Sequence, residues 1–330
     1  MNIAILGGTR FIGPAIVRIL VGQGHKVSVY HSGRTLGELP DGVERVIIDR
    51  TERGQTTAAL RKHRPETIID MIGMESEQIA EIVDAGIPLK HYVFCSSTAV
   101  YGKIGNATPN ESFKPAPDNA YTTGKIACEE LLLNAHRESG FPFTSLRLAH
   151  PYGPLDELIY NTGRESHFLD RMRNGRPILI PGTGETRIHA IYVEDAARAF
   201  VHVLCGDEYM GKIFNLAGEQ IMTLNEYFAS IARALKCALV AEYIPAEWFE
   251  QNADFWKGHP RSFDFATAWY HYQSAFDISA FKSTGFDCLT DHDRGVAENV
   301  AWLDSQGMIP VSSDDDMEDR IIKATRGSYG

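Results

Sequence analysis

The sequence contains no apolar run long enough to cross a bilayer, and its first residues include neither a basic segment nor a long apolar core. A membrane-spanning helix needs about 20 mostly apolar residues, and a secretory leader needs a basic start followed by an apolar stretch. Neither membrane insertion nor secretion is therefore expected. We expect a cytoplasmic protein without a membrane partner.

Cysteine is scarce, and the spacing of the cysteines does not indicate a disulfide framework. The 330 residues include five cysteines, an odd and widely spaced set made up of Cys95, Cys128, Cys205, Cys237 and Cys288. No two of them have the spacing of metal ligands, and scattered cysteines are typical of reduced core thiols in a cytoplasmic protein. We expect neither disulfides nor a metal site.

Basic residues are in deficit, with 32 Lys and Arg against 43 Asp and Glu and a net charge of -11. Proteins that bind nucleic acid usually carry a basic surface, because the phosphate backbone is anionic. The excess of acid therefore argues against nucleic acid as the main partner. At 330 residues the chain is long for one core, so we expect one large and one smaller lobe.

The most informative stretch is the beginning of the chain, which reads N-I-A-I-L-G-G-T-R-F-I-G from Asn2 to Gly13. Ile3 to Leu6 form a short apolar run, typical of a strand buried on both faces. Gly7 and Gly8 follow, and Phe11 to Leu20 have helical spacing. A strand, a glycine turn and a helix in this order bind phosphate, since backbone N–H groups and the helix dipole both favour an anion. The stretch predicts a dinucleotide-binding fold.

Strands and helices alternate through the first half of the chain. We expect strands over 3–6, 26–30, 45–48, 67–72, 91–95 and 144–148, with helices over 11–20, 57–64, 78–84 and 121–139. This order predicts an α/β fold with a doubly wound parallel sheet, the Rossmann arrangement. Ligands of such sheets bind beyond the carboxyl ends of the strands. Those ends carry Gly7, His31, Asp49, Gly73, Ser96-Ser97 and His150.

Pro154 is the expected domain junction. The dinucleotide-binding domain should span 1–154 and receive a further helix and strand from about 188–224. The smaller α/β substrate-binding lobe should comprise 155–187 and 225–308, in which the aromatic-rich stretch 248–272 either packs in the core or stacks on substrate. Residues 309–330 are expected to form a polar C-terminal tail, with D-D-D at 314–316 as a solvated acidic segment.

The end of the second strand bears on the choice between NAD and NADP. An acidic residue there would hydrogen-bond the 2′-hydroxyl of NAD, but this chain has H-S-G-R at 31–34 and Arg10 inside the glycine turn. Two arginines near the ribose can hold a 2′-phosphate, which favours NADP. Alternatively, Arg34 is a solvated turn residue and Arg10 caps the loop, which leaves NAD open. Asp49 is either an acceptor for the adenine or a plain turn acid.

The catalytic prediction rests on Y-T-T-G-K at Tyr121 to Lys125. Residues four apart share one face of a helix, so the ammonium of Lys125 should lie near the phenol of Tyr121. A nearby positive charge lowers a phenol pKa that is ordinarily about 10. Tyr121 would then act as a general base, and Ser97 at the end of the fifth strand would donate to the same oxygen.

These motifs resemble the extended short-chain dehydrogenase/reductase family, the NAD-dependent epimerases and dehydratases of sugar nucleotides. The resemblance rests on G-G-T-R-F-I-G, F-C-S-S-T-A-V-Y-G, Y-T-T-G-K, L-R-L-A-H-P-Y-G-P, I-P-G-T-G and Y-V-E-D-A-A. It implies that Ser97, Tyr121 and Lys125 carry the hydride chemistry and that Lys125 also holds the nicotinamide ribose. The early part is closer to an atypical branch that includes chloroplast stem-loop RNA-binding proteins.

The resemblance and the strand ends together give the expected ligand contacts. Those with the dinucleotide are Gly7, Thr9, Arg10, Phe11, Ile12, Gly13, His31, Ser32, Arg34, Asp49, Arg50, Ile72, Gly73, Tyr121, Lys125 and Leu148. Those with the substrate are Thr98, His150 and Arg187. The family's dehydratases have an acidic pair where this chain has Thr98-Ala99, which argues against 4,6-dehydration. The chain also departs from the family at His150, which replaces an Asn, and at Arg187, one position from the usual nucleotide-binding Arg.

Two classes of function remain. As an enzyme with NAD or NADP, the chain would take a proton from a carbinol of a sugar-type small molecule while hydride passes to the nicotinamide, which gives a keto sugar. If the hydride returns to the other face of the keto sugar, the reaction is an epimerisation. If the keto sugar is released, the enzyme is a net dehydrogenase or, in reverse, a ketone reductase. The alternative is a non-catalytic dinucleotide-fold protein that binds RNA. The resemblance also implies a homodimer, formed through the helices that follow Ile79 and Tyr121.

Overall fold

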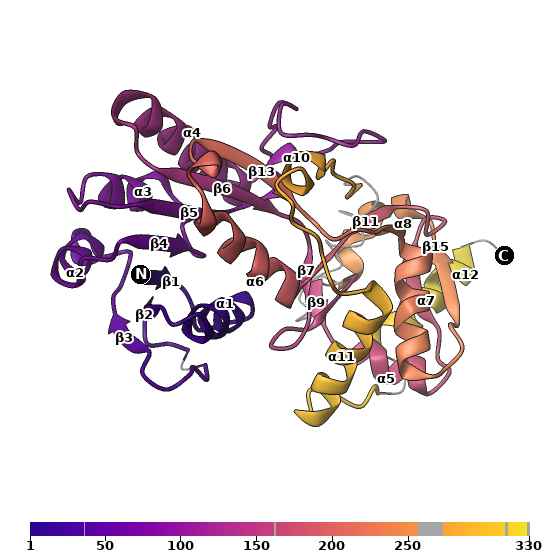
Figure 1. The fold of residues 1–330 in the computed structure, drawn as a ribbon. Coiled ribbons are helices and arrows are strands. Elements are labelled where there is room, and N and C mark those ends of the chain that lie inside the picture. Colours follow the sequence, from indigo (N-terminus) through magenta and orange to yellow (C-terminus); the bar gives the residue numbers. More distant parts are fainter. Residues whose placement is uncertain (36, 162, 257–272, 314–315, 329–330) are drawn as a thin grey trace.

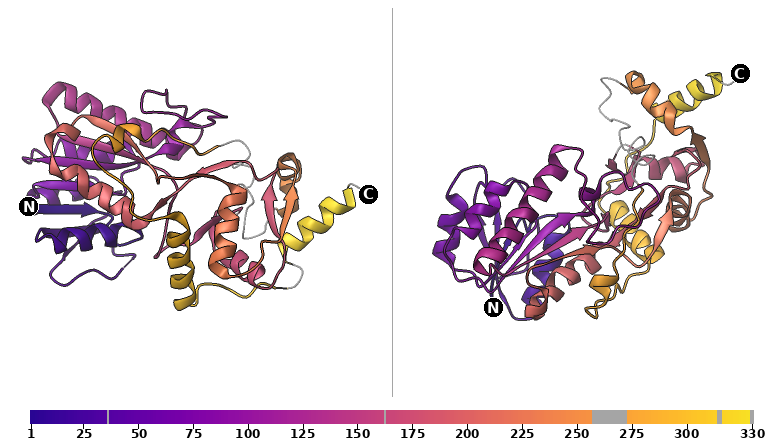
Figure 2. Two further views of the ribbon diagram at one scale, coloured as in Figure 1. Left: turned by 45° about the vertical axis from the view of Figure 1, so that its right-hand side comes forward. Right: turned by 90° about the horizontal axis from the view of Figure 1, so that it is seen from above.

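The computed structural model describes residues 1–35, 37–161, 163–256, 273–313 and 316–328. It has a larger lobe formed mainly by the first half of the chain and a smaller lobe formed mainly by the second half (Figure 1). The two termini lie at opposite ends of the molecule in both views of Figure 2. The site predicted from the sequence belongs to the larger lobe, at its boundary with the smaller one.

The larger lobe is built on a seven-stranded sheet in the order β13-β6-β5-β4-β1-β2-β3, with every neighbouring pair parallel. Its strands are β1 (Asn2–Leu6), β2 (Lys26–His31), β3 (Glu44–Ile47), β4 (Thr67–Asp70), β5 (His91–Ser97), β6 (Phe143–Leu148) and β13 (Lys212–Leu216). The order reverses between β1 and β4, and a crevice at such a reversal is where open α/β sheets bind ligands. The predicted Rossmann architecture is confirmed.

Helices cover both faces of this sheet (Figure 1). Ile3 and Ile5 of β1 face α1 (Ile12–Gly22) and α6 (Val193–His202), whereas Ala4 and Leu6 face α2 (Gln55–His63), α3 (Ser76–Val83) and α4 (Ala120–Ser139). Successive side chains of a strand point to opposite faces, so a strand that is apolar throughout must be covered on both. The apolar run at the start of the chain thus produces a three-layer core.

The polypeptide returns to the larger lobe after entering the smaller one. Strand β13 pairs with β6 at the edge of the sheet, with Lys212 opposite Thr144 and Leu216 opposite Leu148. Helix α6 packs beside α1 in one apolar cluster. Residues 193–216 therefore complete a sheet that begins more than half the chain earlier.

The smaller lobe combines short strand pairs with helices. Its strands are β7 (Pro151–Tyr152), β8 (Leu158–Tyr160), β9 (Gly163–Glu165), β10 (Ile178–Pro181), β11 (Arg187–His189), β12 (Ile191–Tyr192), β14 (Ile221–Thr223) and β15 (Ala241–Ile244). Its helices are α5 (His167–Arg173), α7 (Leu224–Leu235), α8 (Ala246–Gln251), α11 (His292–Ser305) and α12 (Met317–Ser328), whereas α10 (Ser279–Lys282) lies beside β13 of the larger lobe (Figure 1). Single 3₁₀ turns are η1 (Thr98–Tyr101), η2 (Val203–Cys205) and η3 (Asp207–Tyr209) in the larger lobe and η4 (Ala253–Trp256) in the smaller lobe. From the aromatic-rich stretch, Trp248 and Phe249 pack in a buried cluster, while 257–272 lie outside the described residues.

The C-terminal segment departs from the prediction of a solvated acidic tail. Met317, Ile321 and Ile322 form an apolar stripe on α12 that is buried against Leu179 and Ile244. The guanidinium of Arg171, whose side chain has no exposed surface, lies 2.5 Å from the carboxylate of Asp316 and 3.0 Å from that of Asp319. The prediction was wrong for Asp316 and Asp319, because both are partners of a buried arginine, while 314–315 lie outside the described residues.

His167 is a second attachment of α12. Its Nδ1 lies 2.6 Å from the Glu165 carboxylate and its Nε2 lies 2.5 Å from that of Glu318. Burial lowers the pKa of His167, but the hydrogen bonds and charges of the two carboxylates outweigh it and raise the pKa to about 9. The imidazolium is thus the form that holds α12 against α5.

We expect the free energy of unfolding to fall as the pH rises from 6.5 to 9.5. A pKa raised from 6.5 to about 9 in the folded protein contributes stability that is complete below 6.5 and is lost as His167 deprotonates, by about 3 kcal/mol. Urea unfolding at the two pH values, followed by tryptophan fluorescence, measures the difference. His167→Gln is the control and should show a smaller decrease; an equal decrease in both proteins would contradict the assignment.

Candidate active site

The glycine turn is shaped for close approach of a backbone to a ligand. Gly7 has φ 86°, and its N–H donates to the carbonyl of Tyr30 at 2.8 Å. A Cβ on Gly13 would lie 2.6 Å from the carbonyl carbon of Gly8, so only glycine lets α1 start in contact with the turn. The first turn of α1 has no side-chain cap and no acidic residue. The Gly13 N–H donates to the carbonyl of Arg10 at 2.9 Å and Pro14 has no N–H, so the dipole of this uncapped helix end is what favours the pyrophosphate of a dinucleotide.

The middle of the turn contacts the smaller lobe. Phe11 has a strained backbone, with φ 50° and ψ -105°, and its ring lies 5.2 Å from the guanidinium of Arg164. Thr9 is buried, whereas Arg10 is exposed, and its side chain forms no hydrogen bond or ion pair within the described parts of the chain. Arg10 and Phe11 line a cavity of about 690 Å³ together with Trp302 of α11. This cavity connects the predicted cofactor turn to the smaller lobe.

β2 ends at His31, a neutral histidine at the position where dinucleotide-binding folds commonly have an acidic residue. Burial and the charge of Arg45 lower the pKa of His31, and its Nδ1 accepts from the Gly33 N–H at 3.1 Å. Because Nδ1 is the acceptor, Nε2 carries the proton, and it has no partner among the described residues. Ser32 and Arg34 next to it are exposed.

Asp49 follows β3 and forms a tight turn of its own. Its Oδ1 accepts from the N–H and the hydroxyl of Thr51 at 2.9 and 2.7 Å, which lowers the pKa of Asp49, with a smaller contribution from the charge of Arg34. Arg34 and Asp49 therefore lie close enough to interact. The predicted contact with adenine is not tested by this geometry.

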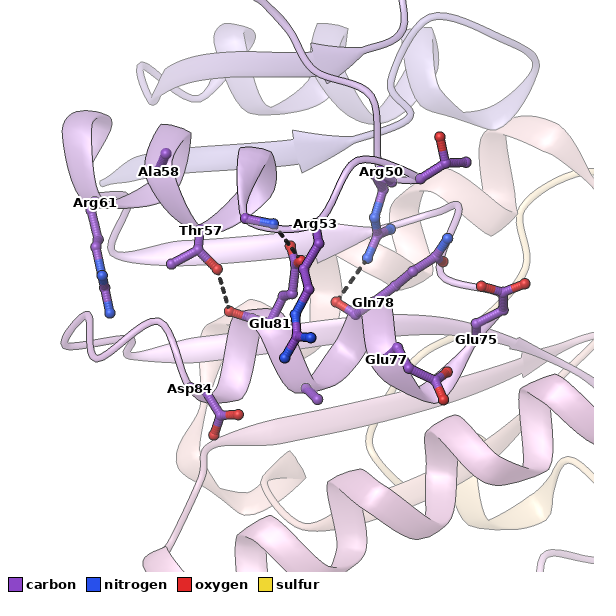
Figure 3. Close-up of a pocket in the computed structure, with 13 residues that line it drawn as sticks. Arg50, Arg53, Thr57, Ala58, Arg61, Glu75, Glu77, Gln78, Glu81 and Asp84 are labelled. Carbon is purple, nitrogen blue, oxygen red and sulfur yellow. Dashed lines mark hydrogen bonds between the residues drawn. The ribbon is translucent and has the colours of Figure 1, made fainter.

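Arg50 differs from the other predicted cofactor residues in being turned into the protein. Its side chain is 7% exposed, and Nη1 lies 2.7 Å from Oδ1 of Asp70. Figure 3 shows it directed from the segment after β3 toward Gln78 of α3, at a cavity of about 880 Å³ between α2 and α3. A direct contact with the cofactor thus remains a prediction, while an ion pair with Asp70 is what the geometry shows.

Asp70 is the residue that sequence reasoning missed. The prediction extended the fourth strand to Ile72, but β4 ends at Asp70, whose Oδ1 accepts from the N–H groups of Ile72 and Gly73 at 3.0 and 2.8 Å. These bonds turn the chain out of the sheet. A charged residue at the end of an apolar strand was the one available signal.

The predicted catalytic residues meet at the carboxyl ends of β4 and β5. Asn119 and Thr122 form a capping box that starts α4 and places Tyr121, 40% exposed, in its first turn. The Ser97 side chain at the end of β5 lies near the phenol of Tyr121, and its Oγ accepts from the Ala99 N–H at 3.2 Å. Lys125 lies one turn further along α4, with Nζ 5.8 Å from the centre of the Tyr121 ring. Ser97, Tyr121 and Lys125 are therefore brought together as expected.

The pKa of Tyr121 moves in the opposite direction from the prediction. Burial raises it above its usual value of 10, and the nearby Ser97 side chain offsets only part of the rise. The buried Nζ of Lys125 instead donates to the carbonyls of Gly73 and Cys95, at 2.7 and 2.6 Å. In this state Tyr121 is a protonated phenol.

The predicted substrate residues lie nearby but are differently engaged. Thr98 is buried, and its hydroxyl donates to the carbonyl of Leu148 at 3.5 Å. His150 is half-buried, and burial together with the charges of Arg164 and His189 lowers its pKa to about 4. Arg187 donates to Gln273 at 3.1 Å and to the carbonyl of Ala107 at 3.0 Å.

The remaining predicted cofactor residues differ in how far their side chains are exposed to solvent. Ile12 is buried in α1, and Leu148 is buried at the end of β6. Ile72 is 39% exposed at the carboxyl edge, next to Gly73. Ile72 therefore offers an apolar surface to a ligand, and Ile12 supports the glycine turn from within.

Comparison with known proteins agrees with this geometry. The model of the NAD dependent epimerase/dehydratase family matches residues 3–217. The chain belongs to this family. It is 31% identical over 277 residues to the chloroplast stem-loop binding protein of 41 kDa b of Arabidopsis thaliana, which covers 80% of this chain and 68% of that protein. It is 23% identical over 313 residues to 2′-dehydrokanamycin reductase of Streptomyces kanamyceticus, covering 94% and 86%.

Solved structures share the fold of this epimerase/dehydratase family member. The UDP-glucose 4-epimerase of Thermotoga maritima with UDP-glucose has a TM-score of 0.73 at 22% identity, covering 93% of this chain and 99% of that one. The dTDP-glucose 4,6-dehydratase of Bacillus anthracis in complex with NAD has a TM-score of 0.75 at 16% identity, covering 97% and 99%.

Family membership and the sugar-nucleotide relatives identify the chain as an enzyme with a nicotinamide cofactor. The glycine turn and the uncapped N-terminus of α1 described above fit such a cofactor. Within the residues that the structure describes, no helix is long and apolar enough to span a membrane.

Proposed function

We propose that the chain is an NAD(P)-dependent oxidoreductase or epimerase that acts on a carbinol of a sugar or sugar nucleotide. The convergence of Ser97, Tyr121 and Lys125 beside the glycine turn carries this proposal. Relatives named as a putative UDP-glucose 4-epimerase of Methanocaldococcus jannaschii and a dTDP-4-dehydro-6-deoxyglucose reductase of Escherichia coli support it.

Each residue has a separate role in the proposal. The Tyr121 oxygen exchanges a proton with the substrate oxygen, and the Ser97 hydroxyl orients both oxygens by hydrogen bonding. Lys125 holds the nicotinamide ribose and favours the phenolate whenever its ammonium turns from the carbonyls of Gly73 and Cys95. A bound nicotinamide supplies hydride acceptance and donation, which the side chains cannot. His150 and Thr98 would then border the sugar, and Arg187 its anionic part.

Ketone reduction is a second candidate, and the protonation state of Tyr121 favours it. A phenol carries the proton that reduction must deliver to a carbonyl oxygen, whereas oxidation must first remove it, and burial raises the pKa of Tyr121. The similarity to 2′-dehydrokanamycin reductase over 94% of the chain points in the same direction. Thr98-Ala99, in place of an acidic pair, argues against 4,6-dehydration.

One assay distinguishes these reactions. The enzyme is incubated with oxidised or reduced dinucleotide and a panel of nucleotide sugars and keto sugars, while nicotinamide absorbance and sugar products are followed together. An epimer without net absorbance change indicates epimerisation, and a stoichiometric change indicates dehydrogenation or reduction. RNA retention with a steep salt dependence and no turnover would instead favour a binding protein like the Arabidopsis relative.

We also propose that NADP binds more tightly than NAD, by about tenfold, through Arg34. His31 lacks the carboxylate that would repel a 2′-phosphate, and one charge-assisted bond is worth about 1.5–3 kcal/mol where solvent is partly excluded. Calorimetric titration of both cofactors at one ionic strength measures the preference. Arg34→Ala should narrow it, and Arg137→Ala, in the last turn of α4, should leave it unchanged. Equal affinities in the wild type, or tighter NAD, would overturn the proposal.

The assembly and location also remain proposals. We propose a cytoplasmic homodimer that pairs through α3 and α4. The two helices lie side by side on the same outer layer of the sheet (Figure 1), and a shallow cavity between them is lined by Ala80, Val83 and Leu131. Sedimentation of the purified protein tests the dimer.

A further inference from the structure

The short turn Ile72–Met74, which follows β4, lies between the two halves of the candidate site. A Cβ on Gly7 of the glycine turn would lie 2.3 Å from Cγ2 of Ile72. A Cβ on Gly124 of α4 would lie 2.1 Å from the carbonyl oxygen of Met74. Glycine inside a helix is unfavourable by about 1 kcal/mol relative to alanine, so close contact with this turn explains Gly124. The turn thus touches both the phosphate cradle and the catalytic helix.

One buried carboxylate sets the shape of the turn. Asp70 has no exposed surface, and its Oδ1 accepts from the N–H groups of Ile72 and Gly73. Its Oδ2 accepts from the hydroxyl of Tyr92 at 2.8 Å, and Arg50 donates to Oδ1 at 2.7 Å. Burial alone would raise the pKa of Asp70, but Arg50 and these hydrogen bonds lower it. The carboxylate is therefore ionised and bonded on both oxygens.

The turn links Asp70 to Lys125 through the backbone of Gly73. The carbonyl of Gly73 accepts from Lys125 Nζ at 2.7 Å, while the N–H of the same residue is held by Asp70 at 2.8 Å. Gln78 of α3 closes the other side: its side-chain oxygen accepts from the Met74 N–H at 3.0 Å, and its carbonyl accepts from Arg50 at 3.3 Å, a contact drawn in Figure 3. The three N–H groups of the turn are thus all bonded, those of Ile72 and Gly73 to Asp70 and that of Met74 to Gln78.

We infer that Asp70, held by Arg50, is a positioning residue that fixes the Ile72–Met74 turn and, through the Gly73 carbonyl, the ammonium of Lys125. This inference rests on the proposed function, because it assigns Asp70 to the dinucleotide side of that site. A buried ion pair often stabilises a fold no more than apolar packing would, since both charges must lose their hydration. Stability alone therefore explains the pair poorly, whereas the geometry of the turn explains it directly.

The test compares Asp70→Asn with Tyr92→Phe. The first keeps the side-chain volume but removes the charge that holds the turn and Arg50. The second removes one bond to the same carboxylate, on the oxygen that accepts no hydrogen bond from the turn. Affinity for NAD and NADP is measured by calorimetry without substrate, and the melting temperature is measured alongside. We expect Asp70→Asn to lose at least about tenfold in affinity and Tyr92→Phe at most about twofold, even where their melting temperatures fall equally.

Arg50 provides the second pair of variants in case Asp70→Asn does not fold. Arg50→Lys keeps a cation beside Asp70 and should retain affinity within about threefold of the wild type, whereas Arg50→Gln should lose about tenfold. Equal affinities in both Arg50 variants and the wild type would overturn the inference while leaving the proposed function intact. A wild type that binds neither dinucleotide would instead overturn the proposed function.

The accessibility of Lys125 to a chemical reagent can be measured without any cofactor. Lys125 is 3% exposed, so an amine-acylating reagent should modify it slowly in the wild type, as measured by peptide mass spectrometry. Arg50→Gln should speed this modification by at least about tenfold relative to Lys62, an exposed lysine of α2 that serves as internal reference. An unchanged ratio would mean that the pair does not position Lys125.

Discussion

Tyr121→Phe is expected to lower turnover by at least about 100-fold, the usual scale for loss of a general acid or base. The substitution removes one oxygen and leaves the ring, which is 40% exposed, so fold and cofactor affinity should remain near those of the wild type. Steady-state kinetics with the substrate identified by the panel assay, together with calorimetric cofactor binding, measures both effects.

Tyr243→Phe is the matched control. Tyr243 is 51% exposed on β15 of the smaller lobe, and its hydroxyl donates to Asn225 at 3.0 Å. Its loss should leave turnover within about twofold of the wild type, as for most surface changes. Wild-type turnover in Tyr121→Phe would remove Tyr121 from the mechanism.

Lys125→Met should weaken turnover by about 100-fold and dinucleotide affinity by about tenfold. Methionine fills the volume of the lysine stem but removes the ammonium that serves both the phenol and the ribose in the proposal. The carbonyls of Gly73 and Cys95 would also lose their donor, which should cost about 1–3 kcal/mol of stability. Kinetics, calorimetry and urea unfolding report these effects separately.

The control for this variant is Lys62→Met on the exposed surface of α2. It should change neither turnover nor affinity. If Lys125→Met moved only the pH optimum and left cofactor affinity at the wild-type value, the ribose role assigned to Lys125 would be wrong, although its role toward Tyr121 would stand.

The parts of the site that were predictable depend on local pattern. The apolar run before Gly7 and Gly8 predicts a buried strand and a phosphate turn whatever the rest of the chain does. Tyr121 and Lys125 are four residues apart, so helix geometry alone brings them to one face. Ser97 follows from its place at the end of a buried strand. In each case the deciding contacts lie within a few residues or follow from the parallel sheet.

What could not be predicted depends on contacts between distant segments. The pKa of Tyr121 is raised by burial, and the Nζ of Lys125 that was expected to lower it donates to Gly73, a residue 52 positions earlier in the chain. The role of Asp70 could not be predicted, because its partner Arg50 follows a different strand. The apolar stripe of α12 was obscured by neighbouring acids whose partner, Arg171, lies 145 residues from Asp316.

The return of β13 to the sheet has a consequence for synthesis on the ribosome. The edge of β6 has no neighbour until residues 212–216 emerge, so the nascent larger lobe carries an open strand edge while the first strands and helices of the smaller lobe are being made. Open edges invite pairing with other chains, which makes this interval the one most exposed to aggregation. A fragment cut at Pro154 would keep that edge permanently, whereas one extended through Leu216 would close it.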